Sequence, residues 1–365
     1  MPARNHKNWL KKPNVEHVSS EIYSSQKIYE EEIKNIFSKV WVPMCHKSEM
    51  SKLGSFRTTQ IAGQNVIAVN DGESIKTYLN TGKFNTPSGT MTRVEFLMDD
   101  YTPLHTEVKH GGMVWTTLNK NPTQSVEQWT AGAFDCIADA IDTEELEVFH
   151  YHKAIIPTNY KLWHDTNSEF YHDFMHYFNR ITGFNDEYFA RKNVPFDNGH
   201  VNVSSFTVNY TEFDKDGDRG ELSFPYLPPN QWYMVDLFPG FNFNLRGSAY
   251  RSDSVTPLGP DSVLIEFRGY GLLKDTLEER ATRIRHHNTI WGPFGRNLHE
   301  DLIGVTGQGV SMAQGTERRN ILHGRHENET IHDEVGMRHY YEEWGQHMEL
   351  DPSNPVFKES EKMVA

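Results

Sequence analysis

The fold and the site of this chain depend on residues 159–176, which read NYKLWHDTNSEFYHDFMH. No proline or glycine interrupts the stretch, so it predicts one helix of about five turns. One stripe of this helix then carries four polar residues, each above or below the next: Asp165, Glu169, His172 and His176. Two histidines one turn apart on one helical face can bind a single metal ion through their ring nitrogens.

The residues around this histidine pair decide how strongly it indicates a metal site. An HxxxH pair alone is a weak signal in a chain with 19 histidines, because such pairs also occur on solvated surfaces. The two acids strengthen it, since metal-bound histidines usually donate their second N–H to a carboxylate or carbonyl. With one further carboxylate, the pair would complete the 2-His-1-carboxylate triad, which suits non-haem Fe(II) and leaves positions open for oxygen and substrate.

The best source of that carboxylate is a helix expected near 297–312, which begins NLHEDLIG. Asp301 is the candidate ligand, because its neighbour Glu300 would point about 100° away on the same helix. The alternative interpretation is that both acids only interact with the positive end of the helix dipole. The sequence leaves both interpretations open.

Charge and cysteine content exclude several classes of protein. The net charge of −14 and the lack of long basic runs make nucleic acid and anionic membranes unexpected partners. No apolar run is long enough to span a bilayer, and the N-terminal residues lack the apolar core of a signal peptide, so a cytoplasmic location is expected. The two cysteines, Cys45 and Cys136, form no CxxC or CxH pair and are interpreted as small buried hydrophobic residues.

The chain divides into three predicted segments: 1–42, 43–122 and 123–365. The first holds an amphipathic helix over 25–41, capped by Ser25. The second is a small antiparallel β domain with strands at 54–62, 65–70, 74–80 and 111–118, and with 83–110 as loop or edge. The third is expected to contain a helix at 125–141, strands at 146–157, 201–213, 232–237, 241–246 and 262–272, and two helices near 276–290 and 297–312.

The last residues, 313–365, carry many charges and aromatics, as in RHYYEEWGQHM, and are expected to cover the domain or contact another subunit rather than form core. The order of the elements predicts an α+β fold, a twisted antiparallel sheet wrapped over helices.

On these motifs the chain resembles the large (α) subunit of the Rieske-type aromatic-ring-hydroxylating oxygenases over most of its length. Two segments are specific: 159–176, with its YHDFMH, and HEDLIGVTGQG at 299–309. The resemblance implies a helix-grip catalytic domain in which His172, His176 and Asp301 hold one mononuclear Fe(II). It also implies that Glu169 couples the iron to the iron–sulfur domain of a neighbouring subunit. Asp165 and Asn159 match the family's polar residues earlier on the same helix, and Asp165 would orient the ligands.

The chain departs from the family at the iron–sulfur cluster. The family's Rieske domain holds a [2Fe–2S] cluster with two cysteines and two histidines, in a CxH pair and a later CxxH pair. The first pair would follow YLN at 78–80, where this chain has no cysteine; His105 and His110 remain but cannot hold a cluster alone. The small β domain is therefore interpreted as a degenerate Rieske domain that binds no [2Fe–2S], and a Rieske, ferredoxin or reductase partner would supply the electrons.

The leading hypothesis is an oxygenase component that hydroxylates or dealkylates a small, largely apolar, aromatic substrate with O₂. Its substrate pocket would be lined by aromatic residues, although any single one of them is more often core than pocket: Phe170, Phe174, Phe178 and Phe243. The family's habit predicts a homo- or heterotrimer, or a hexamer. The alternatives are a non-catalytic α-like subunit and an apolar-ligand-binding helix-grip protein. The sequence does not choose between dihydroxylation, monohydroxylation and dealkylation.

Overall fold

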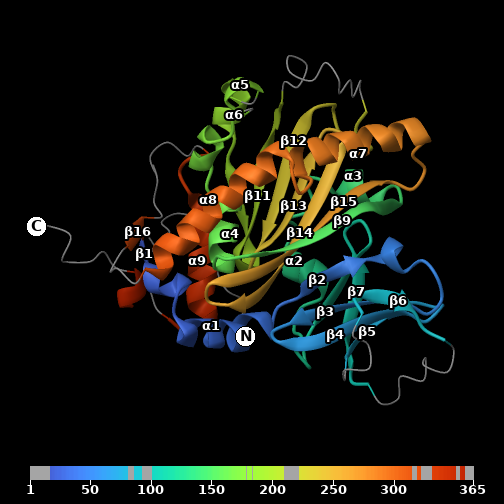
Figure 1. Ribbon diagram of the computed structural model, residues 1–365, viewed down its shortest axis with the longest axis horizontal. Helices are drawn as coiled ribbons and strands as arrows, with labels where there is room; N and C mark the ends of the chain where they lie inside the picture. Colours follow the sequence, from blue (N-terminus) through green and yellow to red (C-terminus); the bar gives the residue numbers. More distant parts are fainter. Residues whose placement is uncertain are drawn as a thin grey trace, which may run out of the picture.

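A computed structural model describes residues 17–80, 86–92, 101–177, 179–182, 184–208, 222–314, 319–321, 331–350 and 354–357. Its strands form two seven-stranded antiparallel sheets and a two-stranded pair, with helices gathered on the larger body (Figure 1). The predicted α+β fold is confirmed. Among the described residues, no helix combines the length and the apolar character of a membrane span.

The small sheet lies in the first third of the chain. Its strands follow in spatial order: β2 (Val42–His46), β8 (Met113–Thr117), β7 (Pro103–Lys109), β5 (Ile75–Leu79), β4 (Gln64–Asn70), β3 (Ser55–Ile61) and β6 (Ser88–Thr90). The four predicted strands correspond to β3, β4, β5 and β8. Strand β7 falls where only a loop or edge was expected, because its residues alternate between exposed and half-buried positions and give no clear hydrophobic pattern.

The large sheet carries the site. Its strands follow in spatial order: β10 (Asn193–Phe196), β11 (His200–Thr207), β12 (Gln231–Leu237), β13 (Phe241–Arg246), β14 (Ala249–Gly259), β15 (Ser262–Leu272) and β9 (Leu146–Ile156). Strands β10 and β14 were not predicted. The end of the strand predicted at 201–213 lies outside the described residues.

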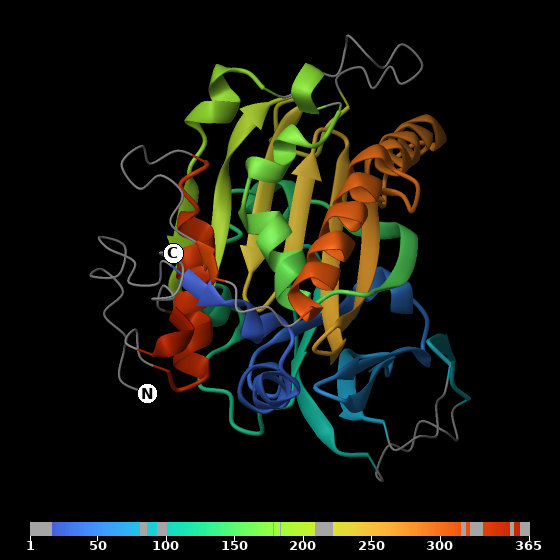
Figure 2. The same ribbon diagram turned by 60° about the vertical axis from the view of Figure 1, so that its left-hand side comes forward.

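Helices cover one face of the large sheet. Helix α4 (Tyr160–Ser168) and helix α8 (Arg296–Ala313) lie side by side across it, and α7 (Leu277–Trp291) continues along the sheet from α8 (Figures 1 and 2). The remaining helices are short or peripheral: α1 (Gln26–Glu32), α2 (Val126–Thr130), α3 (Ala138–Asp142), α5 (Asn179–Thr182), α6 (Asp186–Ala190) and α9 (Val335–His347). Strands β1 (His17–Ser19) and β16 (Arg319–Ile321) form the separate pair.

Of three predictions about helical segments, one is confirmed and two are corrected. The N-cap at Ser25 is confirmed, since its hydroxyl accepts the N–H of Ile28. The helix predicted at 125–141 is broken into α2 and α3, because Ala131 and Gly132 adopt positive φ angles of 55° and 84°. The prediction that 313–365 contributes little core is wrong for α9: Tyr340, Tyr341 and Trp344 are fully buried.

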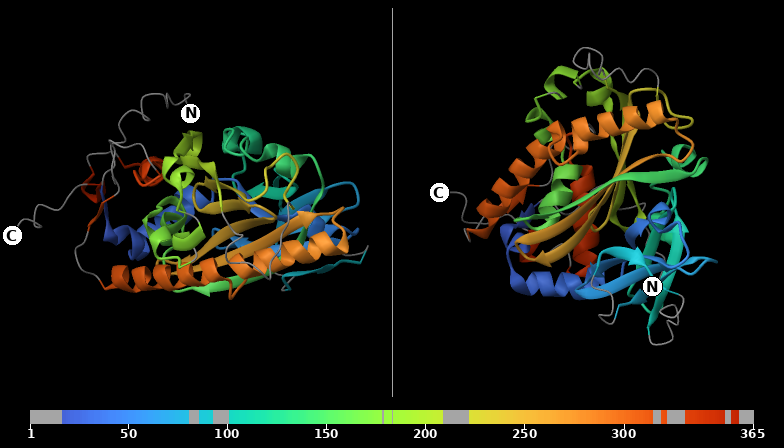
Figure 3. Two further views of the ribbon diagram at one scale, coloured as in Figure 1. Left: turned by 90° about the horizontal axis from the view of Figure 1, so that it is seen from above. Right: turned by 45° about the vertical axis from the view of Figure 1, so that its right-hand side comes forward.

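The two faces of the large sheet differ because side chains alternate along a strand. On β13, Phe241, Phe243 and Leu245 point to the face opposite the helices. There Phe243 contacts Trp115 and Phe134, whose ring centroids lie 6.2 and 4.8 Å away, so this face packs on the small sheet and on the segment joining α2 to α3. The same side of the large sheet faces the small domain in Figure 3. The alternate residues of β13, Asn242, Asn244 and Arg246, point toward the helices.

The prediction of one continuous helix over 159–176 is wrong. Helix α4 ends at Ser168, Glu169 is extended (φ −97°, ψ 145°), and a 3₁₀ turn, Tyr171–Phe174, follows. The break has two causes. Ser168 Oγ donates a 2.6 Å hydrogen bond to Asp236 Oδ2 on β12, and Glu169 Oε2 accepts the N–H of His172 at 3.1 Å. The four polar residues therefore do not form one stripe.

Candidate metal centre

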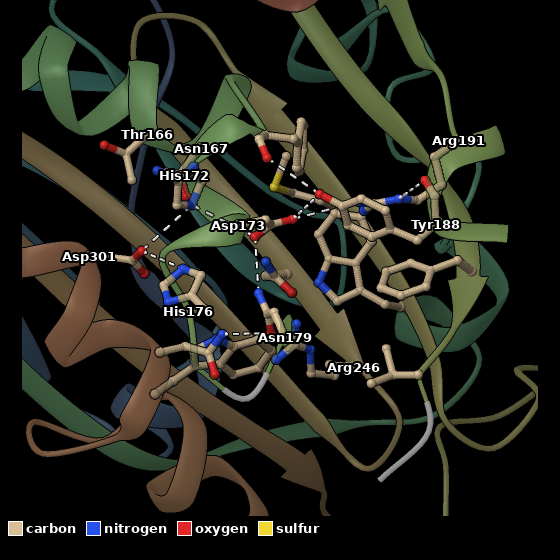
Figure 4. A pocket seen from close by; sticks show the side chains of 18 of the residues that line it. Thr166, Asn167, His172, Asp173, His176, Asn179, Tyr188, Arg191, Arg246 and Asp301 are labelled. Carbon is tan, nitrogen blue, oxygen red and sulfur yellow. Dashed lines mark hydrogen bonds and ion pairs between the residues drawn. The ribbon is translucent and has the colours of Figure 1, made fainter. Parts of the chain in front are cut away.

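Three side chains from two separate segments meet beside the large sheet. His172 comes from the 3₁₀ turn, His176 from the residues just after it, and Asp301 from α8. Asp301 Oδ1 lies 2.9 Å from His176 Nε2 and 3.6 Å from His172 Nε2. Figure 4 shows the two rings and the carboxylate turned toward one another. The structure thus brings together the three predicted ligands.

The donor set fits a divalent metal ion. Neighbouring ligand atoms of one octahedral ion, each bound at about 2.1 Å, lie about 3 Å apart. The separation of 2.9 Å matches this value, and 3.6 Å needs only a small adjustment. Asp301 Oδ1 is buried and makes no hydrogen bond with any described residue, despite its short distance to His176 Nε2. Asp301 Oδ1 and His176 Nε2 therefore lie close together without forming a hydrogen bond. This arrangement is expected of two atoms that bind the same metal ion.

Asp173 is the other carboxylate near the two histidines. Its Oδ1 lies 3.9 Å from His172 Nε2 and accepts a hydrogen bond from Asn179 Nδ2 at 3.1 Å. Its Oδ2 accepts the hydroxyl of Tyr188 at 2.8 Å. Because both oxygens of Asp173 have partners and neither approaches the histidines as closely as Asp301 does, Asp301 is the better third ligand.

The outer ring nitrogens of both histidines are held by acids. His172 Nδ1 lies 2.6 Å from Glu169 Oε1, and His176 Nδ1 lies 2.7 Å from Glu300 Oε2. An Nδ1–H held in this way leaves Nε2 unprotonated and directed at the metal position. Glu169 therefore contacts His172, and its predicted coupling to a neighbouring subunit stays a prediction. From the sequence, Glu300 was expected to point away from the site. In the structure, Glu300 contacts Nδ1 of His176 and the adjacent Asp301 contacts Nε2 of the same ring.

The electrostatics of the site favour a cation. Burial by itself lowers the pKa of His172, but the carboxylates of Glu169, Asp173 and Asp301 raise it to about 10. Burial likewise lowers the pKa of His176, and the close, negatively charged carboxylate of Asp301 raises it overall. The acids that hold protons on these rings would stabilise a metal ion in the same place.

Two other residues predicted on this segment precede the histidines: Asp165 within α4 and Asn159 at its N-terminus. Asp165 is buried and accepts hydrogen bonds from Tyr23 at 2.8 Å and Tyr341 at 2.9 Å, rather than from either histidine. It ties α4 to the N-terminal segment and to α9, so it can orient the ligands only through the helix. Asn159 caps α4, since its side-chain oxygen accepts the N–H of Lys161.

Helix α8 is positioned by a close approach to the start of α4. Thr158 Oγ1 donates a 3.0 Å hydrogen bond to the carbonyl of Val305. A Cβ at Gly309 would lie 2.7 Å from the carbonyl oxygen of Pro157, so only glycine lets the two segments meet there. This contact lies about two turns after Asp301 on α8. The GVTGQG run thus serves helix packing beside the metal centre.

A cavity of about 60 Å³ opens beside the three ligands. Of the four aromatic residues predicted to line a pocket, Phe170 does so. Phe174 is 45% exposed, Phe243 packs on the opposite face of the sheet, and Phe178 lies outside the described residues. The expectation of a largely apolar pocket is wrong for this cavity, because its lining includes three arginines: Arg191, Arg246 and Arg251.

Sequence reasoning missed these arginines, although a signal was present. Strand β13 reads FNFNLR, and every second residue is polar. Two of these polar residues, Asn244 and Arg246, line the cavity, and so does Arg251, which pairs with Asn244 across β13 and β14. A strand buried on both faces with one wholly polar face indicates a binding site on that face.

The fold is that of a helix-grip domain, and the candidate ligands His172, His176 and Asp301 have the 2-His-1-carboxylate composition found in mononuclear non-haem iron enzymes. Residues 143–350 match the family described as ring hydroxylating alpha subunit (catalytic domain). The chain belongs to this family of oxygenase α subunits and is an oxidoreductase. Its family implies a mononuclear iron and a small substrate.

Two relatives resemble most of the chain. The methanesulfonate monooxygenase hydroxylase subunit alpha of Methylosulfonomonas methylovora is 52% identical over 97% of this chain and 97% of the relative. The 2-aminobenzenesulfonate 2,3-dioxygenase subunit alpha of Alcaligenes sp. is 30% identical over 94% of this chain and 97% of the relative.

Solved structures share the fold at low identity. A naphthalene 1,2-dioxygenase from Rhodococcus sp. bound to indole superposes with a TM-score of 0.75 at 16% identity, covering 91% of this chain and 94% of that chain. A quaternary ammonium Rieske monooxygenase superposes with a TM-score of 0.71 at 16% identity, covering 94% of this chain and 98% of that chain.

Proposed function

We propose that this chain binds one Fe(II) through His172, His176 and Asp301 and hydroxylates a small organosulfonate, with methanesulfonate as the first candidate. The observation that carries the proposal is that the ligand triad and the buried arginines share one cavity of about 60 Å³. The names of the two relatives, one a methanesulfonate monooxygenase and the other a 2-aminobenzenesulfonate dioxygenase, point to the same class of substrate.

The size of the cavity favours a one-carbon sulfonate over an aromatic one. A cavity of about 150 Å³ is known to hold benzene. The cavity beside the triad is well below that volume. Aromatic rings do line it, including Phe170, Trp232 and Trp291, but they narrow the space around the arginines. An aromatic sulfonate is the second candidate, because these rings could stack on one if the pocket widened.

The bound iron would supply the activation of O₂, and the chain's residues would prepare the site for it. Glu169 and Glu300 hold the Nδ1 protons of the two histidines and keep both Nε2 atoms directed at the metal position. The aromatic side chains of the lining, Phe170, Trp232 and Trp291, would shield the reacting C–H bond from water. The arginines balance the charge of the sulfonate, which would otherwise be costly to bury.

The reaction would insert one oxygen atom into a C–H bond. Methanesulfonate, O₂, two electrons and two protons would give hydroxymethanesulfonate and water. That product is the bisulfite adduct of formaldehyde, so it would separate into formaldehyde and sulfite. With the other candidate substrates, the same site would perform hydroxylation or dealkylation according to which bond lies next to the iron.

The two electrons would come from a cluster on a partner protein. Burial raises the pKa of the Cys45 thiol well above its usual range and that of Cys136 to about 12, so neither is a ready thiolate ligand. The alignment with the methanesulfonate relative runs to 403 positions, more than the 365 residues of this chain, so the relative carries segments that this chain lacks. A Rieske, ferredoxin or reductase donor would then approach Glu169, within a trimer or hexamer.

The experiment begins with protein purified anaerobically and loaded with Fe(II). We expect about one iron per chain and no labile sulfide. Hydrogen peroxide carries both an oxygen atom and two electrons, so with methanesulfonate it should give formaldehyde and sulfite without any donor protein. His176→Ala is the control and should lose both iron and product.

Each result separates the proposal from its alternatives. Failure to retain iron after reconstitution would overturn the oxygenase proposal and leave a non-catalytic subunit or an apolar-ligand-binding protein. Iron without any product from methanesulfonate or 2-aminobenzenesulfonate would overturn the assignment of the substrate class. Labile sulfide in stoichiometric amount would contradict an external cluster.

A further inference from the structure

The three arginines of the cavity differ in the partners they have. Arg191 is enclosed by the protein: its Nε donates to the carbonyl of Tyr188 at 3.2 Å. Its guanidinium lies 4.2 to 5.0 Å from the centres of four aromatic rings, those of Tyr188, Phe206, Trp232 and Phe170. Its Nη2 also lies 3.7 Å from Asp173 Oδ2. Arg191 therefore serves the packing behind the metal centre.

Arg251 has more unused hydrogen-bonding capacity than Arg191: two of its buried nitrogens lack a hydrogen-bond partner among the described residues, against one, Nη2, in Arg191. Arg251 lies on β14, is 3% exposed, and lines the same cavity as the three metal ligands. Its Nη2 donates a 2.8 Å hydrogen bond to Asp253 Oδ2. Its Nε and Nη1 are buried and have no hydrogen-bond partner among the described residues. A buried guanidinium with unused donors is an unfavourable arrangement unless a ligand completes it.

The groups around Arg251 keep its position fixed and its charge directed at the cavity. Asp253, two residues along the strand, holds one edge of the guanidinium. The ring of Trp291 lies 4.9 Å from the guanidinium carbon. Asn244 lies directly across the strand pair and is itself a lining residue. Arg246, one strand over, adds a second positive charge to the same lining.

We propose that Arg251 is the anchor for the anionic head group of the substrate, and that an organic sulfonate binds with an oxygen on its unpartnered nitrogens and its carbon directed at the metal position. This inference rests on the proposed function, since it assigns the recognition of the substrate that the oxygenase would use. Arg251 is thus the residue that distinguishes an anionic substrate from a neutral one of equal size. The oxygens of a sulfonate are hydrogen-bond acceptors only, which matches donors that have nothing else to bind.

The test compares two ligands of nearly the same shape. Methanesulfonate carries a negative charge, and dimethyl sulfone replaces one of its oxygens by a methyl group and is neutral. Binding of each to the full Fe(II)-loaded chain is measured anaerobically by calorimetry. We expect Arg251→Gln to weaken methanesulfonate binding about 10- to 100-fold and to change dimethyl sulfone binding less than threefold. The iron content should stay at the wild-type level.

Two further variants guard against a folding defect. Asn244→Asp keeps Arg251 but places a carboxylate opposite it, and it should weaken methanesulfonate binding by a similar factor. Arg251→Lys keeps the charge and should lose less than Arg251→Gln. The matched control is Arg280→Gln, which removes the same charge from a position on α7 paired with Glu147 and Asp275, and it should leave binding unchanged.

The outcomes separate this inference from the proposed function. Equal losses for methanesulfonate and dimethyl sulfone, or wild-type methanesulfonate binding by Arg251→Gln, would overturn the assignment of Arg251. If methanesulfonate is oxidised and Arg251→Gln keeps its KM, the proposed function stands and the inference falls. If methanesulfonate binds through Arg251 but is never oxidised, the inference stands and the proposed reaction falls.

Discussion

The two seven-stranded sheets of this chain differ in what their buried polar groups do. In the small sheet, buried hydroxyls bond to one another: Thr77 Oγ1 lies 2.6 Å from Thr106 Oγ1 and 2.7 Å from Thr116 Oγ1. In the large sheet, the face toward the helices carries Arg251 and Asn244, and three of their polar atoms have no hydrogen-bond partner in the part of the chain that the structure describes: Arg251 Nε and Nη1 and Asn244 Oδ1. The threonine hydroxyls of the small sheet satisfy one another, and the large sheet has a face that a ligand would complete.

The comparison teaches that the two sheets have separate tasks. The small sheet packs on the far side of the large sheet through Trp115 and Phe243 and forms part of the hydrophobic core there. The proposed metal centre lies on the opposite side, among α4, α8 and the 3₁₀ turn. Damage to one sheet should therefore change stability, and damage to the other should change ligand binding.

The largest expected effect concerns the third metal ligand. Asp301→Asn should lower the affinity for Fe(II) by more than about 1000-fold, because it removes a charged ligand from the centre. Asp173→Asn should change that affinity less than about tenfold, since Asp173 is already bonded to Asn179 and Tyr188. Metal titration under anaerobic conditions measures both. The reverse order would make Asp173 the ligand.

The second effect is on the small sheet. Ile67 on β4 is fully buried in a cluster with Phe56, Val69 and Met91. Ile67→Ala should lower the free energy of unfolding by about 2 to 4 kcal/mol, through lost burial and a remaining cavity. Urea denaturation of the variant measures the loss, and its affinity for Fe(II) should remain at the wild-type value. Weakened iron binding in the folded variant would show that the two sheets are coupled.

A smaller effect is expected at the outer contact of His176. Glu300→Gln keeps the shape of the side chain but removes the charge that faces His176 Nδ1 at 2.7 Å. Fe(II) affinity should fall about 10- to 100-fold. Glu349→Gln, an acid far along the chain from the site, serves as the charge control. Unchanged iron affinity in Glu300→Gln would remove Glu300 from the metal centre.

The smallest effect is a pH dependence from Asp165. Burial raises the pKa of Asp165 to about 6, although His164 and the hydroxyls of Tyr23 and Tyr341 oppose the rise. The folded protein then holds this proton more tightly than the unfolded chain, so stability should fall as the pH rises from about 4 to about 6. The contribution is about 1 to 2 kcal/mol.

Asp165→Asn isolates that contribution, because asparagine does not titrate. The free energy of unfolding of wild type and variant is compared at several pH values between 4 and 7. Relative to the variant, the wild type should lose stability across this window. A difference that stays constant with pH would mean that Asp165 titrates alike in both states, and iron binding should be little affected because Asp165 contacts neither histidine.

The sequence by itself predicted the type of metal centre that we propose. The spacing of His172 and His176 and the acids near them predicted a histidine-based site, and the NLHEDLIG helix supplied the third ligand that the structure brings within 3.6 Å of both rings. Four of the seven strands of the small sheet and five of the seven strands of the large one also followed from their hydrophobic patterns. These features are local, because a few neighbouring residues contain the whole signal.

Only the tertiary structure decided how the site is assembled. Helix α4 ends at Ser168 because a carboxylate on β12, Asp236, bonds to it from a distant part of the chain. Helices cover one side of the large sheet, and the small sheet covers the other. Side chains alternate between these two sides along β13 and β14, and this arrangement puts the arginines on the side of the helices, facing the cavity. Such contacts join residues far apart in sequence, and no local pattern encodes their partners.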